Sequence, residues 1–321
     1  MDDRQLLAKL GAGRLSGDAL ARELGHTRAA VWKRIQGLRA AGIAIEGRAG
    51  DGYQLQQPLD LLDAAAIRTA LPSSLGSELA SMEVVWTVGS TNSELLRCSV
   101  PERGAAVLLA ERQTGGRGRR GREWASPLAA HVYLSVLRGF AGGLSRLGGL
   151  SLVAGVAVAE ALRAAGYREV ALKWPNDIVV QGHKLGGLLV EGGGEFAGPA
   201  RAVIGLGLNV RMPAAFAAQI TQPWTDLSTL AGGEVSRNEI VARVLGALLP
   251  ALAEFERDGL APFLPRYAAL DSLAGQAVRV EDGGAWHEGR ALGLADDGAL
   301  RVRIGASERV FHAGEVSVRA Q

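Results

Sequence analysis

The feature that most constrains this chain is a run of glycine and arginine at residues 113–124, Gln113-Thr-Gly-Gly-Arg-Gly-Arg-Arg-Gly-Arg-Glu-Trp124. Glycine adopts left-handed backbone dihedrals at little cost, so the backbone N–H groups of such a run can approach an anion closely. Guanidinium groups add planar forks that match phosphate oxygens. The run therefore predicts an anion-binding loop, although the Walker A pattern of phosphate-binding loops occurs nowhere in the chain.

Two other interpretations of this run are a disordered RNA-binding tail and a solvated basic loop. A tail needs low-complexity surroundings, but the run lies between the apolar segments 107–110 and 131–137, which both have the pattern of strands. A loop held between two buried strands favours a ligand site over a tail.

Composition indicates a globular protein with more than one domain. The chain has 321 residues, of which 48% are apolar and 21% charged, which is enough for a sizeable core in two to three domains. Because the net charge is only +2, any nucleic-acid surface has to be a local patch. The single cysteine, Cys98, excludes an internal disulfide and a multi-cysteine metal site, which fits a reducing compartment.

No segment has the pattern of a signal peptide or of a membrane span. The first residues lack a basic segment followed by an apolar one. The most apolar stretch, 150–162, contains Glu160 and is too short to cross a bilayer. We therefore expect a soluble, cytoplasmic protein.

Residues 1–57 have the pattern of a winged helix-turn-helix domain. A short first helix is followed by helices over 17–24 and 28–41, for which Ser16 and Thr27 are good N-caps. The apolar positions of the third helix that point into the core are Val31, Ile35 and Leu38. After it, two short apolar segments flank a glycine-rich tip, which predicts a β-wing.

The outer face of the third helix and the wing carry the residues that we expect to contact DNA. These are Arg28, Ala29, Trp32, Lys33, Gln36 and Arg39 of the helix and Arg48 of the wing. The basic side chains suit phosphates, while Arg28 and Gln36 can reach base edges. One winged helix carries little specificity, so a DNA-binding role implies a dimer that reads two half-sites. The alternative is a winged helix used only for protein contacts.

The rest of the chain predicts an α+β fold in two further domains, a central one over 64–271 and a C-terminal one over 274–321. Pro58 marks the boundary between the first domain and the central one. In the central domain we expect a buried helix over 150–165, because that segment is apolar on every side. The other expected elements are helices at 64–71, 90–96, 237–257 and 260–270, strands at 82–87, 107–110, 131–137, 170–180, 184–191 and 202–210, an irregular segment at 211–226, and a small β-barrel over 277–319.

Two polar segments interrupt these elements. Ser90-Thr-Asn-Ser-Glu94 is either a helix N-cap or a polar pocket wall, and its composition alone favours the cap. Trp174-Pro-Asn-Asp177 is a turn between strands, because proline cannot donate to a sheet ladder. Its asparagine and aspartate are either turn formers or functional side chains.

Three motifs together resemble those of biotin protein ligases. They are Gly116-Arg-Gly-Arg-Arg-Gly-Arg122 followed by Trp124, Lys173-Trp-Pro-Asn-Asp177, and Lys184-x-x-Gly-x-Leu-x-Glu191. The resemblance covers nearly the whole chain in order and, with the winged helix, extends to the bifunctional ligases that also repress biotin synthesis. It implies the class II aminoacyl-tRNA synthetase and biotin ligase fold for the central sheet and an SH3-like barrel at the C-terminus.

The resemblance also implies roles for individual residues. The expected biotin-binding residues are Ser90, Thr91, Asn92, Gln113, Gly116, Arg117, Gly118, Arg119, Arg120, Lys184 and Gly187. The expected ATP-binding residues are Arg119, Arg122, Trp124, Asn176, Lys184, Asn209 and Trp224. Lys184, Asp177 and Arg119 are the expected catalytic residues, with Asp177 orienting or deprotonating the incoming amine. Two positions depart from the family pattern. Glu123 stands where a basic residue is common, and His131 stands where an asparagine is common.

The activity that the resemblance implies is the attachment of biotin, through biotinyl-5′-adenylate, to a lysine of the carrier domain of acetyl-CoA carboxylase. Its substrates would be biotin and ATP, with Mg²⁺ carried by the ATP. The expected partners are the carrier domain, operator DNA and a second copy of the chain in a ligand-promoted homodimer. Alternatives are a lipoate-type ligase, a winged-helix ligand sensor without turnover, and a DNA-binding scaffold.

Overall fold

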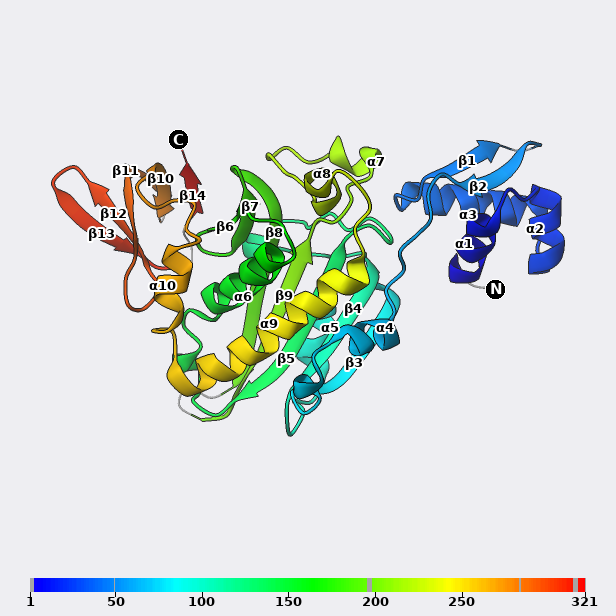
Figure 1. Cartoon of the computed structure of the whole chain (residues 1–321). Coiled ribbons are helices and arrows are strands. Elements are labelled where there is room, and N and C mark those ends of the chain that lie inside the picture. The colour runs from blue at the N-terminus through cyan, green and yellow to red at the C-terminus, as the bar shows by residue number, and fades with distance from the viewer. Residues whose placement is uncertain (1–2, 49, 195–197, 283, 314–316, 321) are drawn as a thin grey trace.

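The computed structural model describes residues 3–48, 50–194, 198–282, 284–313 and 317–320. Residues 1–2 of the predicted first domain, and 314–316 and 321 of the predicted third, lie outside this part. A small helical part with a hairpin lies to one side of a large central sheet, and a second, smaller sheet lies to the other side (Figure 1).

The N-terminal part is a helix-turn-helix followed by a two-stranded wing, as predicted. Its elements are α1 (Asp3–Ala12), α2 (Gly17–Leu24), α3 (Arg28–Ala40), β1 (Ile45–Arg48) and β2 (Gly52–Leu55). The side chains of Ser16 and Thr27 accept the N–H groups of Ala19 and Ala30, so both predicted N-caps are confirmed. α3 packs through the three apolar residues that its periodicity indicates, all of them buried.

Within the described residues the central sheet has seven strands in the order β3-β4-β5-β9-β8-β7-β6, and only β3 and β4 run parallel. The strands are β3 (Leu79–Val88), β4 (Ala105–Gln113), β5 (Val132–Phe140), β6 (Val170–Lys173), β7 (Asp177–Val180), β8 (His183–Gly194) and β9 (Ala200–Leu208). The helices around it are α4 (Ala64–Ala70), α5 (Thr91–Arg97), α6 (Leu150–Ala164), α7 (Ala214–Ala217), α8 (Leu227–Ala231), α9 (Arg237–Asp258) and α10 (Phe263–Ala268), with 3-10 turns at Ser73–Leu75, Arg119–Gly121 and Leu144–Arg146.

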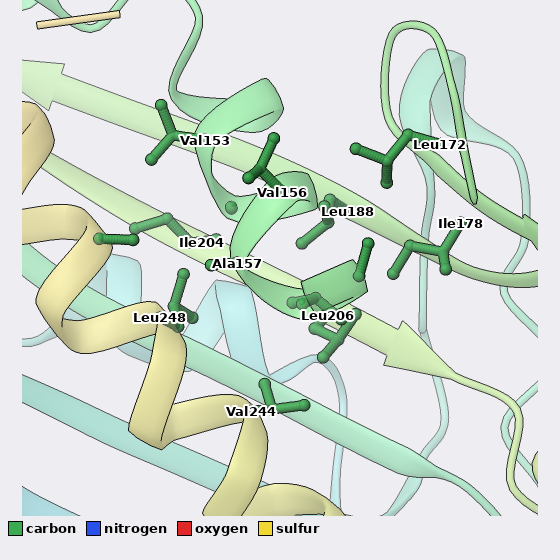
Figure 2. Close-up of a cluster of buried hydrophobic side chains, with 14 of the residues drawn as sticks. Val153, Val156, Ala157, Leu172, Ile178, Leu188, Ile204, Leu206, Val244 and Leu248 are labelled. Carbon is green, nitrogen blue, oxygen red and sulfur yellow. The ribbon is translucent and has the colours of Figure 1, made fainter. Parts of the chain in front are cut away.

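The two faces of this sheet are covered differently. On one face α6 and α9 pack with Val156 and Leu248 against Ile204 and Leu206 of β9, in a buried apolar cluster (Figure 2). Side chains alternate along a strand, so the neighbouring residue Val203 points to the other face, where it packs with Leu95 of α5, Leu108 and Leu137. α6 is buried on nearly every side, as its composition predicts.

The linker between the N-terminal part and the sheet is held by a buried ion pair. Arg237, at the start of α9, donates to a Glu111 oxygen at 2.8 Å, and both side chains are essentially inaccessible to solvent. The other Glu111 oxygen accepts the N–H of Leu62 at 2.6 Å, and Arg237 also donates to the Asp60 carbonyl. Hydrogen bonds to the linker backbone therefore offset part of the desolvation cost of burying this ion pair.

The C-terminal part is an antiparallel sheet in the order β13-β12-β11-β10-β14. Its strands are β10 (Ala277–Asp282), β11 (Ala285–Leu294), β12 (Leu300–Ile304), β13 (Ser307–Phe311) and β14 (Ser317–Ala320). The sequence predicted a small β-barrel here, and the structure has an antiparallel sheet domain; among the described residues its edge strands β13 and β14 are not paired with each other. The buried Trp174 joins it to the central sheet by donating its indole N–H to the Gly298 carbonyl at 3.0 Å.

One stretch differs from expectation. The segment 211–226, predicted as irregular, contains the short helix α7, and it is followed by α8, which the pattern did not predict. Asp226 starts α8 by accepting the N–H of Thr229 at 2.8 Å, which is the usual role of an N-cap aspartate. No helix in the described part of the chain is long and apolar enough to cross a membrane.

Candidate active site

A cleft of about 830 Å³ lies on the face of the central sheet that α6 and α9 leave uncovered. Of the residues predicted for ligand binding and catalysis, those that line it are Ser90, Thr91, Asn92, Gln113, Arg117, Gly118, Arg119, Arg120, Arg122, Trp124, Asn176, Asp177, Lys184, Gly187, Asn209 and Trp224. These residues come from six separate stretches of the chain, and the fold brings them to one place.

Glycines on β9 form the floor of the cleft. Gly205 and Gly207 lie under the Asn92 carboxamide and the Trp124 indole, so a Cβ at either position would collide with the group above it. In the sheet, Gly205 lies between Ser135 and Leu189, and Gly207 is paired with Gly187. The floor is therefore open because these two residues of β9 lack side chains.

At one end of the floor, Lys184 and Asp177 form an ion pair with 2.6 Å between Nζ and Oδ1. The β7–β8 ladder has a bulge, because Ile178 pairs with Gly186 while Val179 pairs with Lys184. The extra residue turns Lys184 to the same side as Asp177, which regular alternation would not do. Gly187 lies beside the pair, and a Cβ there would be in ordinary van der Waals contact with the lysine Cε at 3.4 Å.

The segment 90–94 serves both as a helix cap and as a wall of the cleft. The Ser90 hydroxyl caps α5, while Thr91 and Asn92 are buried on the cleft side. Thr91 donates its backbone N–H to Gln113 Oε1 at 2.8 Å, and its hydroxyl oxygen lies 3.1 Å from the same atom. The two interpretations of this segment that the sequence left open are thus compatible.

The arginine loop is a folded turn over the cleft. Gly118 N–H donates to the Arg122 carbonyl at 2.8 Å, and Trp124 N–H donates to the Gly116 carbonyl at 2.9 Å. Arg120 has φ 58°, in the left-handed region that non-glycine residues seldom adopt. Gly116 does not line the cleft, since it packs against the Trp124 backbone and the Ser126 hydroxyl, and its part in ligand binding stays a prediction.

The four arginines of the loop have different surroundings. Arg117 is paired with Glu191 at 2.9 Å, and Arg120 is paired with Glu281 of the C-terminal sheet at 3.1 Å. Arg119 donates to Asn176 Oδ1 at 3.4 Å and also to the Ala313 carbonyl. Burial lowers the pKa of Arg119, and the Asp177 carboxylate opposes that shift. Arg119 and Arg122 both line the cleft, and Arg119 is close enough to Asp177 to interact with it electrostatically.

Two tryptophans and Asn209 complete the side of the cleft next to Lys184. The Lys184 Nζ lies 5.5 Å from the centroid of the Trp124 ring, within cation–π range. Trp224 forms a β-bridge with Lys184. Asn209 donates to the carbonyls of Lys184 and Thr225 at 3.3 and 3.1 Å, so its amide braces these two segments together.

On the winged helix, the predicted DNA-contacting residues fall into two groups. Trp32 is 53% exposed, and Ala29 and Lys33 are also exposed. Arg28 and Arg48 are exposed and paired with Asp18 and Asp51, and Gln36 is half-buried. Arg39 differs, because its guanidinium binds the carbonyls of Ile45 and Gly47 and lies over the Tyr53 ring. It therefore holds the wing against α3.

The sequence did not single out several residues of the cleft. Gly205 and Gly207 line it, although their strand suggested close approach of a backbone or ligand only in general terms. Ser135, buried on β5, hydrogen-bonds Asn92 Oδ1 at 2.5 Å. Glu191 stands in a motif but was given no role, and it contacts both Arg117 and Asn92. Alternation of glycine with apolar residues along β9 was the available signal for the first two.

Comparisons with known proteins agree with this geometry. A model of the biotin/lipoate A/B protein ligase family matches residues 86–209, a helix-turn-helix model matches 3–54, and a model of the biotin protein ligase C-terminal domain matches 274–319. The bifunctional ligase/repressor BirA of Escherichia coli strain K12 is 37% identical over 317 residues, which are 98% of this chain and 97% of that protein.

Two further relatives cover less of the chain. The biotin–acetyl-CoA-carboxylase ligase of Mycobacterium tuberculosis is 36% identical over 273 residues, 83% of this chain and 98% of that protein. The structure of a biotin protein ligase from Aquifex aeolicus in complex with biotin and ATP superposes with a TM-score of 0.64 and 27% identity, over 75% of this chain and all of that one. The chain belongs to the biotin protein ligase family.

Proposed function

We propose that the cleft activates biotin with ATP and transfers it to a lysine of a carboxylase carrier domain. The observation that carries the proposal is the Lys184–Asp177 ion pair, which lies under an arginine loop on a glycine floor. The named relatives with biotin ligase activity support the choice of substrate.

The first step forms a mixed anhydride. A carboxylate oxygen of biotin attacks the α-phosphorus of ATP, the bond from that phosphorus to the bridging oxygen breaks, and pyrophosphate leaves. Two anions have to meet, so the site needs concentrated positive charge. Lys184 and the guanidinium groups of Arg119 and Arg122 supply this charge at the cleft wall. Trp124, whose ring lies 5.5 Å from Lys184 Nζ, and Trp224, which forms a β-bridge with Lys184, offer flat surfaces for the adenine ring.

The second step transfers the biotinyl group. A lysine amine of the carrier attacks the carbonyl carbon of the anhydride, and AMP leaves with the electron pair of the broken bond. The amine has to be neutral to attack, and Asp177 is the carboxylate placed to orient it or take its proton. We expect Asp177→Asn to slow transfer more than adenylation. An equal loss in both steps, measured in single turnovers, would contradict that role.

The proposal includes Mg²⁺ bound to the ATP phosphates, where it would neutralise charge and orient the leaving pyrophosphate. Among the described residues no three histidine, cysteine or carboxylate side chains lie close enough to hold a metal ion. An ion carried by the phosphates needs no such cluster. Lys184 and the loop arginines would contact the phosphate oxygens beside it.

We also propose that the chain represses biotin-synthesis genes as a ligand-promoted homodimer in the cytoplasm. The exposed face of α3 supports DNA contact, and the relatives named ligase/repressor support the combination of activities. Trp32, Lys33 and Arg48 are the residues best placed for it, whereas Arg39 is engaged with the wing.

The direct test is transfer of biotin to a purified carrier domain with ATP and Mg²⁺, read with streptavidin. Wild type should label the carrier, and Lys184→Ala and Arg119→Gly should lower labelling by about 100-fold or more, as the loss of one preorganised charge does elsewhere. Lys33→Ala is the matched control and should label normally while losing operator binding. A wild type that binds biotin but labels nothing would be a sensor without turnover.

A further inference from the structure

The polar wall of the cleft is a connected network that begins at Glu191. This carboxylate, near the middle of β8, accepts the Asn92 side-chain N–H at 2.8 Å and the Arg117 guanidinium at 2.9 and 3.1 Å. Arg117 in turn donates to the Ser93 hydroxyl at 2.6 Å. One glutamate thus binds both the wall and the first arginine of the loop.

The contacts of Asn92 fix the orientation of its carboxamide. Nδ2 faces two groups that only accept, the Leu189 carbonyl at 3.1 Å and Glu191 Oε2 at 2.8 Å. Oδ1 accepts the hydroxyl proton of Ser135 at 2.5 Å. A flipped amide would set its oxygen against a carbonyl and a carboxylate, so only one orientation is allowed. Both N–H groups are then used, and Asn92 can offer a ligand only an acceptor.

The directions of the hydrogen bonds are also fixed from Asn92 through Ser135 and Thr91 to Gln113. Because Ser135 donates to Asn92, its oxygen is left to accept from Thr91, 2.7 Å away. Gln113 Oε1 accepts the Thr91 N–H, so the Gln113 NH₂ group is left for a ligand. A cyclic urea has two N–H donors and one carbonyl acceptor. A wall with a fixed acceptor at Asn92 and a fixed donor at Gln113 matches both kinds of group.

We propose that Glu191 is a positioning residue for biotin, and this inference rests on the proposed function. It does not touch the substrate. It holds Asn92 in the one amide orientation and keeps Arg117 against β8, so that the wall presents an ordered pattern of donors and acceptors. A glutamine there has the same shape but turns a donor toward either the Asn92 amide or the Arg117 guanidinium.

The test compares Glu191→Gln with wild type and with Glu160→Gln, which removes a similar, partly exposed ion pair between α6 and Arg266 of α10. In Glu191→Gln we expect the KM for biotin to rise by about tenfold, the loss of one hydrogen bond to a charged group. The KM for ATP, kcat at saturating biotin and Tm should stay within the range of the control. A glutamate with only a structural role would change Tm, kcat and both KM values together, and an unchanged KM for biotin would overturn the proposal.

Two double-mutant cycles show the route by which Glu191 acts. In an Asn92→Ala background, Glu191→Gln should cost much less than tenfold, while in an Arg117→Met background most of its effect should remain. If Glu191→Gln raised the KM for biotin by the same factor in both backgrounds, positioning through Asn92 would be contradicted. Calorimetric titration with biotin alone separates the two proposals, because Glu191→Gln should weaken binding even if the wild type transfers no biotin. If the wild type fails to bind biotin, the proposed function and this inference both fall.

Discussion

Along β9, Ile204 and Leu206 point into the apolar core beneath α6 and α9 (Figure 2). Ala202 and Leu208 belong to the same core, whereas Gly205 and Gly207 lie on the floor of the cleft on the other face. The first face is stabilised by the packing of apolar side chains, since its leucine and isoleucine side chains are almost wholly inaccessible to solvent. The second face is defined by missing side chains and by hydrogen bonds between the groups above it. A single strand therefore carries stability on one side and recognition on the other, and substitutions should separate the two.

The largest effect should come from the buried ion pair between Arg237 of α9 and Glu111 of β4. Arg237→Met leaves Glu111 buried without its partner, which costs about 4 kcal/mol of the free energy of unfolding. Urea unfolding measures this cost. The double variant Arg237→Met with Glu111→Leu should recover much of the loss, and a single variant as stable as wild type would show that the pair is dispensable.

A core residue of β9 comes next. Leu206→Ala should lower the free energy of unfolding by about 3 kcal/mol, because it removes buried methyl groups and leaves a cavity. At a temperature where the variant is folded, the KM values for biotin and ATP should stay near those of wild type. A large change in either KM without a loss of stability would mean that the two faces are not separable.

The adjacent residue should behave in the opposite way. Gly207→Ala adds a methyl group that collides with the Trp124 indole, so the ring has to move away from Lys184. Misplacement by about 1 Å can lower a rate by about 100-fold, and we expect a loss of that order in kcat/KM with a Tm close to that of wild type. Labelling at the wild-type rate would contradict the placement of Trp124.

The smallest effect concerns pH. His131 is fully buried next to Arg237, and burial lowers its pKa from 6.5 to about 4. The unfolded chain therefore takes up a proton first as the pH falls, so stability is complete above about pH 6.5 and is lost progressively toward pH 4. Between pH 7 and pH 5.5 the loss should be about 1 kcal/mol. His131→Asn keeps an acceptor for the Val210 N–H, and parallel stability curves for variant and wild type would contradict this account.

Local signals in the sequence predicted the fold well because many helices begin at capping residues and because apolar segments mark the buried elements. Ser16 and Thr27 cap the helices that they were expected to cap, and most residues of the nearly uniformly apolar helix α6 are buried. α8 was not predicted, although Asp226 is its N-cap. Its five residues are too few to show a helical period, so the aspartate was the only signal.

The motifs predicted most residues of the site, but they did not predict the contacts between those residues. The motifs gave Lys184 and Asp177, but their contact depends on a bulge in β8 that no local pattern marks. Arg39 has the sequence position of a phosphate contact, yet the wing that it binds is formed by residues after it in the chain. The role of Glu191 depends on two strands, β5 and β8, and the helix α5 meeting at one point, which only the folded structure brings together.

The measurement that tests the central claim most directly is exchange of labelled pyrophosphate into ATP, with and without biotin. This reaction reports the first chemical step alone and needs no carrier protein. We predict exchange that requires biotin, falls by at least about 100-fold in Lys184→Ala, and persists in Leu206→Ala. Biotin binding without exchange in the wild type would contradict the account, and it would leave the cleft as a site that senses biotin without activating it.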